Sequence, residues 1–141
     1  MKALNFALII LAVLVFSASQ VSAGEFDSLI SSLNVQAEAN IGDFKVNLGA
    51  TFGAPVPQVD MVIASVASPG EAYLIFNVAE VSNKPVDVVI AEYKKNKGKG
   101  WGVIAKNLGI KPGSKEFHAL KNNKMASGSP EKVKGKGKGK R

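Results

Sequence analysis

Apolar and polar positions alternate strictly over residues 35–52, which is the spacing of β-strands with one buried face. One apolar series ends at Ile41, the next begins at Phe44, and a Gly-Asp pair separates them. A two-residue turn at this pair places Ile41 opposite Phe44 and puts both series on one face. The alternation therefore predicts a β-hairpin over about 34–52. An isolated hairpin is only marginally stable, so we expect the rest of the chain to cover it.

Helical spacing precedes and follows the predicted hairpin. Phe26, Leu29, Ile30 and Leu33 recur at i, i+3, i+4 and i+7, which predicts a short amphipathic helix. The apolar segment 58–67 fits either a helix or a buried strand, and we favour a helix.

Start and stop signals divide the remaining chain into further helices. Ser68, proline at the next position and Glu71 form a capping-box sequence ahead of a helix over 72–81, which is apolar nearly all round and is expected to be central. The spacing then predicts amphipathic helices over 86–95 and 101–108. Ser114 is the expected N-cap of a last helix.

The periodicity ends near residue 122, and the last residues alternate lysine with glycine. Such a segment buries too little apolar surface to fold, so a disordered tail is predicted over 122–141. The fold class predicted is α+β and mainly α. It comprises one small domain over 24–121, with the hairpin at about 34–52, helices over about 58–121 and the disordered basic tail.

The N-terminus has the organisation of a secretory signal peptide. Lys2 precedes an apolar run over 6–16, and Val21 and Ala23, three and one positions before Gly24, suit cleavage there. The run is too short to span a bilayer as a helix. We therefore expect residues 1–23 to be removed, the protein to be exported to the periplasm or secreted, and no transmembrane helix to remain. Without cysteine, neither a disulfide nor a lipid-anchored N-terminal cysteine is available.

Charge is divided along the chain. Residues 24–92 carry nine acidic side chains against two lysines, whereas residues 93–141 carry fifteen basic side chains against two glutamates. This asymmetry suits an anionic partner for the second half, or head-to-tail association of two copies.

Two groups of basic residues are the candidate sites for anionic ligands. Trp101 lies among the first group and could form a platform for a base or sugar, although a buried Trp101 is the favoured alternative because it shares a helical face with Ile104. The first group comprises Lys94, Lys95, Lys97, Lys99, Lys106 and Lys111. The second, in the tail, comprises Lys132, Lys134, Lys136, Lys138, Lys140 and Arg141.

The expected partners are nucleic acid, lipopolysaccharide, polyphosphate or an anionic membrane. Binding by mobile lysines proceeds through counterion release, so it is salt-sensitive and has low specificity. The alternative for the tail is a role in solubility alone.

The segment 101–120 is similar in part to a helix-turn-helix, with Ala105 and Gly109 at the expected spacing. The likeness ends where Lys115 occupies a position that should be apolar. Export would also separate the protein from the chromosome, so we favour a structural helix corner over a DNA reader. Whether the segment binds anything stays open.

A longer stretch, from about Ala72 to Lys121, resembles a block of uncharacterised exported bacterial proteins. The resemblance is carried by Gly-Trp-Gly at 100–102, Leu-Gly-Ile-Lys-Pro-Gly-Ser at 108–114 and Glu-Phe-His at 116–118. It implies an exported helical module and no particular activity.

No catalytic, metal or cofactor site is predicted. His118 is the single histidine and has no cysteine with which to bind zinc, while Glu92, Asp87 and His118 lack an identifiable nucleophile. The glycines near residue 100 lack P-loop spacing. The predicted function is a non-enzymatic exported binding protein. The alternatives are a self-assembling envelope or extracellular protein, and a small hydrolase or lytic accessory enzyme.

Overall fold

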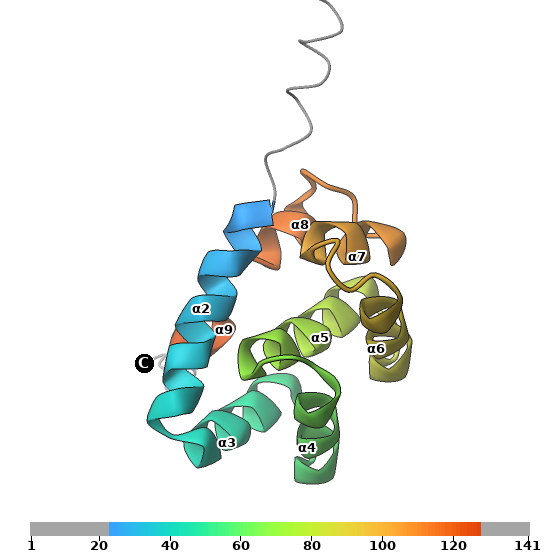
Figure 1. Cartoon of the computed structure of the whole chain (residues 1–141). Helices are drawn as coiled ribbons and strands as arrows, with labels where there is room; N and C mark the ends of the chain where they lie inside the picture. The colour runs from blue at the N-terminus through green and yellow to red at the C-terminus, as the bar shows by residue number, and fades with distance from the viewer. Residues whose placement is uncertain (1–22, 128–141) are drawn as a thin grey trace, which may run out of the picture.

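A computed structural model describes residues 23–127, and these residues form helices joined by turns and loops, with no strand among them (Figure 1). The predicted signal peptide lies almost wholly outside this range, as do the basic residues of the second candidate group. In chain order the helices are α2 (Ala23–Ala39), α3 (Ile41–Phe52), α4 (Val56–Ser65), α5 (Pro69–Ser82), α6 (Val86–Lys95), α7 (Trp101–Asn107), α8 (Lys115–Ala119) and α9 (Lys124–Ser127).

The α+β prediction is wrong, because the region of the predicted hairpin forms the end of α2 and all of α3. A hairpin would bury Val35 and Val46, but both side chains are 65% exposed. The buried side chains of α3 are instead Phe44 and Leu48, four residues apart on one helical face. The alternating pattern therefore arose because the exposed Val35 and Val46 stand between the buried positions of a helical stripe.

The Gly-Asp pair is the first turn of α3 rather than a hairpin turn. The side-chain oxygen of Asn40 accepts a hydrogen bond from the backbone N–H of Asp43 at 3.0 Å, which caps the helix N-terminus. At the other end Gly53 adopts the left-handed conformation, with φ at 66°, and closes α3. Both helix ends therefore have their own sequence signals.

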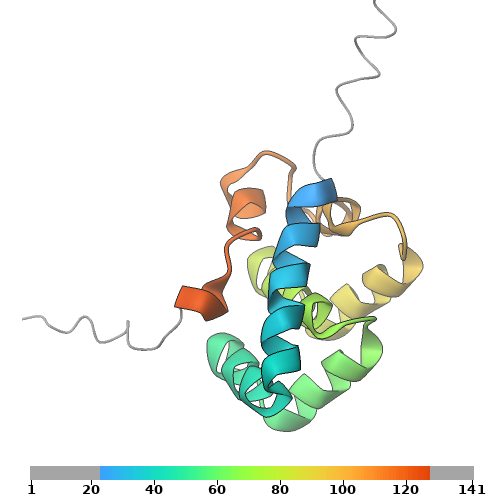
Figure 2. The same cartoon turned by 60° about the vertical axis from the view of Figure 1, so that its left-hand side comes forward.

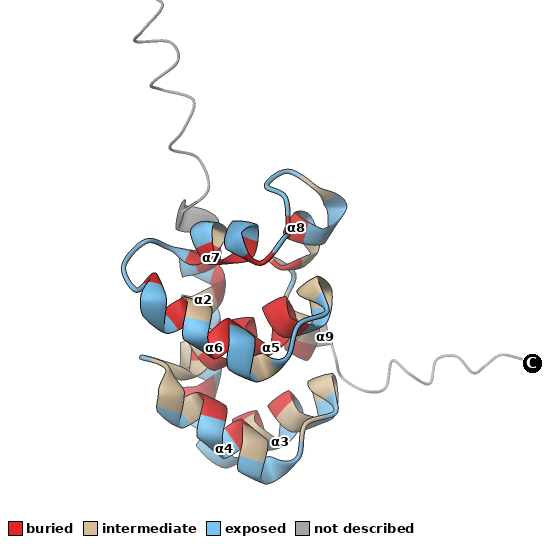
Figure 3. Ribbon diagram, turned by 90° about the vertical axis from the view of Figure 1, so that its right-hand side faces the viewer, coloured by how far each residue is buried: buried red, intermediate tan, exposed pale blue. Residues whose placement is uncertain are grey.

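Helix α5 lies at the centre of the molecule and packs against α2, α3, α4 and α6. Every residue from Ala72 to Ala79 is buried, as predicted for a helix apolar nearly all round (Figure 3). Figure 2 shows α2 crossing α5, and Gly70 permits this approach. A Cβ at Gly70 would lie only 2.5 Å from the carbonyl oxygen of Ile30. The Gly70 N–H also donates to Asn34 at 2.7 Å.

The helices predicted after Pro57 are confirmed by α4 to α8, including the cap of α8, where the Ser114 hydroxyl accepts from the Phe117 N–H at 3.1 Å. The capping box predicted for α5 does not form. Ser68 stands at the N-cap but its side chain makes no capping bond, and Glu71 accepts a hydrogen bond from the Tyr93 hydroxyl instead.

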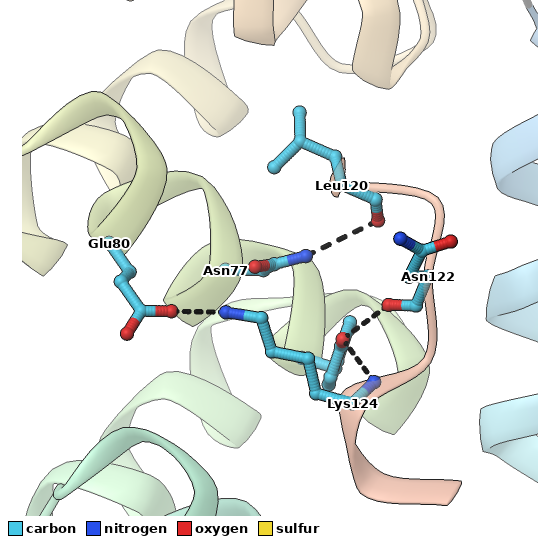
Figure 4. A network of polar contacts seen from close by, with 6 residues as sticks. Asn77, Glu80, Leu120, Asn122 and Lys124 are labelled. Carbon is cyan, nitrogen blue, oxygen red and sulfur yellow. Dashed lines mark hydrogen bonds and ion pairs between the residues drawn. The ribbon is translucent and has the colours of Figure 1, made fainter. Parts of the chain in front are cut away.

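The packed body extends past the predicted boundary at Lys121, because the segment 122–125 is fastened to α5 (Figure 4). The buried Tyr73 hydroxyl donates to the carbonyl oxygen of Asn122 at 2.8 Å and accepts from the N–H of Lys124 at 2.9 Å. The Lys124 ammonium pairs with Glu80. The start of the predicted tail is therefore part of the globule.

A second polar contact holds the same segment. The amide nitrogen of Asn77, which is fully buried, donates to the carbonyl oxygen of Leu120 at 3.2 Å, while its amide oxygen has no partner within the described structure. Met125 is buried beyond it, with 9% of its surface exposed. Tyr73 and Asn77 of α5 therefore hold the segment 120–125 against the body.

Within residues 23–127, no single helix has the length and apolar character needed to cross a membrane. The successive helices α4 and α5 have them only as a pair, and their axes are bent by 115° relative to each other.

A candidate binding cavity beside the lysine–glycine loop

One hollow lined by described residues has a volume of about 410 Å³. It lies between the start of α2, the ends of the α4–α5 and α6–α7 connections, and the start of α7. The residues that line it include Phe26, Asp27, Ile30, Ala67, Glu71, Tyr93, Asn96, Lys97, Gly98, Lys99, Gly100, Trp101 and Ile104. It therefore adjoins the first group of candidate lysines.

The loop from Lys97 to Gly100 forms one wall of the cavity. Gly98 and Gly100 both have positive φ angles, at 88° and 94°, so glycine is needed to turn the chain from α6 into α7. Lys97 and Lys99 alternate with these glycines and are exposed. The backbone conformation thus requires the two glycines, whereas the two lysines border the cavity.

Trp101 does not form the open platform considered from the sequence. Only 5% of its surface is exposed, and its ring packs against that of Tyr93 with centroids 5.5 Å apart. The alternative, a tryptophan buried at a helix start, is confirmed. The ring supports the floor of the cavity but offers little face to a ligand.

Tyr93 and Glu71 form a polar contact at the cavity. The Tyr93 hydroxyl donates to one carboxylate oxygen of Glu71 at 2.8 Å and accepts from the Ala67 N–H at 3.1 Å. Burial, followed by the hydrogen bond to Glu71, raises the pKa of Tyr93 above its ordinary value. The phenol therefore stays protonated at neutral pH and fixes the position of the carboxylate.

The lining carries charges of both signs. Asp27 on α2 and Glu71 on α5 supply carboxylates, while Lys97 and Lys99 supply ammonium groups from the loop. No hydrogen bond or ion pair joins these lysines to either carboxylate. The sequence analysis did not identify Asp27, Glu71 or Tyr93 as site residues, because their meeting depends on helix packing.

The other candidate residues lie outside the cavity. Lys94 and Lys95 are exposed at the end of α6, Lys106 is exposed in the last turn of α7, and Lys111 is exposed in the following loop. Only Lys95 approaches an acidic side chain, at 4.0 Å from Glu92. Lys132 to Arg141 belong to the part of the chain that the structure does not describe.

Glu92 has a structural role. One of its carboxylate oxygens accepts from the amide of Asn96 at 2.6 Å and from the amide of Asn107 at 2.7 Å, which ties α6 to α7. No described hydrogen bond or ion pair joins Glu92 or Asp87 to His118, which is exposed on α8. The three residues considered for acid–base chemistry therefore do not form a linked group.

The helix-turn-helix likeness is also limited by length. Helices α7 and α8 have seven and five residues, so α8 is little more than one turn.

Among the described residues, no cluster of histidine, cysteine, aspartate and glutamate side chains has the geometry to hold a metal ion.

Comparisons with protein-family models, with curated proteins and with solved structures gave no match.

Proposed function

We propose that the protein is a non-enzymatic, exported binding protein whose basic second half attaches to anionic polymers or surfaces. One observation carries the proposal: exposed lysines without acidic partners gather on α6, α7 and the loops that follow them. Residues 93–125 contain nine lysines and a single glutamate. The lysines that are exposed and form no ion pair within the described structure include Lys94, Lys97, Lys99, Lys106 and Lys111.

The distribution of charge in space supports attachment through the second half of the chain. Helices α7 and α8 lie at one end of the molecule and α3 and α4 at the other (Figure 3). The α3–α4 end carries the exposed side chains of Asp43 and Asp60, of which Asp60 pairs with Lys45 at 2.9 Å. The α7–α8 end is therefore the more basic end of the described structure, and an anionic polymer is attracted to it.

The lining of the cavity also bears on the alternative of a small hydrolase. No serine, threonine or histidine is found among its described lining residues. The pKa of Tyr93 is raised, which is opposite to the change that activates a nucleophile. These features disfavour a hydrolase that uses a serine, threonine, histidine or tyrosine nucleophile, whereas chemistry by the carboxylates of Asp27 and Glu71 is a separate question for an activity assay.

The test measures the binding of the mature chain to duplex DNA, polyphosphate and anionic vesicles at low and high salt. A triple variant, Lys94→Gln, Lys97→Gln and Lys99→Gln, is expected to lower the slope of log affinity against log salt for DNA by about 2–3, as for the loss of that many phosphate contacts. Lys84→Gln, an exposed lysine at the end of α5, is the matched control. Binding that is independent of salt and unchanged in the triple variant would refute the proposal.

The contribution of the tail is measured separately with a chain that ends at Ser127. This end point retains Met125, whose side chain is buried, so the packed body is kept intact. Weaker, less salt-sensitive binding by the shortened chain is expected. Equal binding by both chains would restrict the attachment to the lysines of the body.

Export is part of the proposal and has its own test. The mass of the protein recovered from its native host should correspond to a chain that begins at Gly24. A cytosolic product that retains residues 1–23 would contradict it.

Head-to-tail self-association is a second candidate, favoured by the opposite charges of the two ends. Its version through hairpin edges is withdrawn, because residues 23–127 contain no strand. Sedimentation velocity over a range of concentrations separates the two functions, since a monomer at every concentration excludes assembly. Loss of the assembly in Asp43→Asn would support the charged contact.

A further inference from the structure

We propose that the cavity beside the loop 97–100 binds a small zwitterion with an aliphatic side chain, either a free amino acid or a short peptide. This site goes beyond the attachment to anionic polymers, because it recognises an amine as well as an acid. Its volume of about 410 Å³ is within the range of about 300–1,000 Å³ typical of small-molecule sites. Acidic side chains in its wall also make it a poor site for a polyanion.

The carboxylate wall is arranged to receive an amine. Glu71 is half-buried, and the Tyr93 hydroxyl holds one of its oxygens at 2.8 Å. No hydrogen bond within the described structure engages the second oxygen. Asp27 is exposed on α2 and lines the same cavity. An ammonium group placed here makes charge-assisted hydrogen bonds with a carboxylate that is already oriented.

The loop supplies the complementary charge. Lys97 and Lys99 line the cavity, are exposed and have no acidic partner in the described structure. A ligand carboxylate therefore has two ammonium groups within its reach on this side. Two opposite charges on one small molecule match the two sides of the cavity.

Part of the remaining accessible surface is aliphatic. Ile30 is half-buried and Ala67 is exposed at the cavity, whereas Phe26 and Trp101 show only 2% and 5% of their surfaces. Stacking of a nucleobase needs an open aromatic face, which these rings lack. The lining thus favours an aliphatic side chain over an aromatic base.

The experiment titrates the isotope-labelled mature chain with leucyl-leucine and with leucine, and follows backbone amide signals by NMR. Saturable shifts are expected at Gly98, Gly100 and Ile30, with a dissociation constant of about 1 mM or lower, which is reasonable for so small a ligand. N-acetyl-leucine lacks the amine and leucinamide lacks the acid. Each should bind at least about ten-fold more weakly than leucine, because one charge-assisted contact is lost. The two unblocked ligands decide between peptide and amino acid.

Variants locate the site. Glu71→Gln keeps a side chain that can bond to Tyr93 but removes the charge, and it should weaken leucyl-leucine binding by about ten-fold. Asp43→Asn, an equal change of charge on α3, should leave binding unchanged. The inference is overturned if neither unblocked ligand gives saturable shifts at the cavity, or if the blocked forms bind as well as leucine.

Polymer binding by the same variants keeps the two proposals separate. Glu71→Gln should bind duplex DNA at least as well as the parent chain, since it loses a negative charge. Leucine binding that fails while salt-sensitive DNA binding persists overturns only the cavity site. Leucine binding that persists without DNA binding overturns only the attachment function.

Discussion

Removing the Tyr73 hydroxyl tests how firmly the segment 122–125 is fastened to α5. Tyr73→Phe keeps the ring, and with it the edge contact to Phe52, whose centroid is 5.4 Å away. It removes only the bonds to the carbonyl oxygen of Asn122 and the N–H of Lys124. The change is therefore one of hydrogen bonding and scarcely one of packing.

The magnitude follows from these two bonds. A buried hydrogen bond contributes about 1 kcal/mol net, and a group that stays buried without a partner costs about 1–3 kcal/mol. Two such groups give an expected loss of about 2–3 kcal/mol in the free energy of unfolding. The upper end is limited because the segment can separate from α5 and hydrate its backbone, at the expense of the burial of Met125.

Urea unfolding followed by the fluorescence of Trp101, the single tryptophan, measures this loss. The chain offers a matched control in Tyr93→Phe, which also removes one donated and one accepted bond. Tyr93 borders the cavity, where water can replace the hydroxyl, so its loss should cost less than about 1 kcal/mol. An effect of Tyr73→Phe below about 0.5 kcal/mol, or equal to that of Tyr93→Phe, would refute the reasoning.

Three further predictions concern stability. Burial raises the pKa of Tyr73 and Tyr93 above 10.0, so the unfolded chain loses these protons at lower pH than the folded chain does. The free energy of unfolding should therefore hold up to about pH 10 and fall above it. Urea titrations across that range should show a shallower fall for Tyr73→Phe. Gly70→Ala should destabilise by at least about 1–3 kcal/mol despite alanine's better helix propensity, because the new Cβ would meet an α2 carbonyl oxygen at 2.5 Å; a gain in melting temperature would contradict the close crossing. Phe44→Ala should cost about 3–5 kcal/mol and Val46→Ala less than about 0.5 kcal/mol in chemical denaturation, whereas a hairpin with both side chains on one buried face would make both costly.

The helices after Pro57 could be predicted because their ends carry local signals. Pro69, Pro85 and Ser114 start helices, and Gly109 ends the turn after α7 with φ at 96°. These residues act through backbone geometry and nearby hydrogen bonds, which a sequence displays directly. The prediction of the four helices α5 to α8 therefore did not depend on tertiary contacts.

The helix predicted around Phe26 to Leu33 is confirmed by α2, but residues 34–52 were predicted wrongly because they fit two periods at once. Leu33 and Ala37, and later Phe44 and Leu48, continue a helical stripe, but exposed Val35 and Val46 complete an alternating pattern. Asn40, three residues before Asp43, carried a helix-start signal that the Gly-Asp pair obscured. Only packing decides which period is buried.

The candidate site was predicted in part. The lysines of the loop were evident from composition, and the burial of Trp101 followed from its helical face. The carboxylates of Asp27 and Glu71 belong to helices that are distant in sequence, and only the crossing of α2 and α5 brings them to the same cavity. A pairing of this kind has no local signature.

The attachment of residues 120–125 to α5 has a mechanical consequence. If the C-terminal end is held on a surface, tension on the chain reaches Tyr73 and Asn77 before it reaches any intervening helix. Load then passes into the middle of the globule through a few short bonds. Helices α6 to α8 form a closed loop between the two anchor points, and they bear no tension until those hydrogen bonds break.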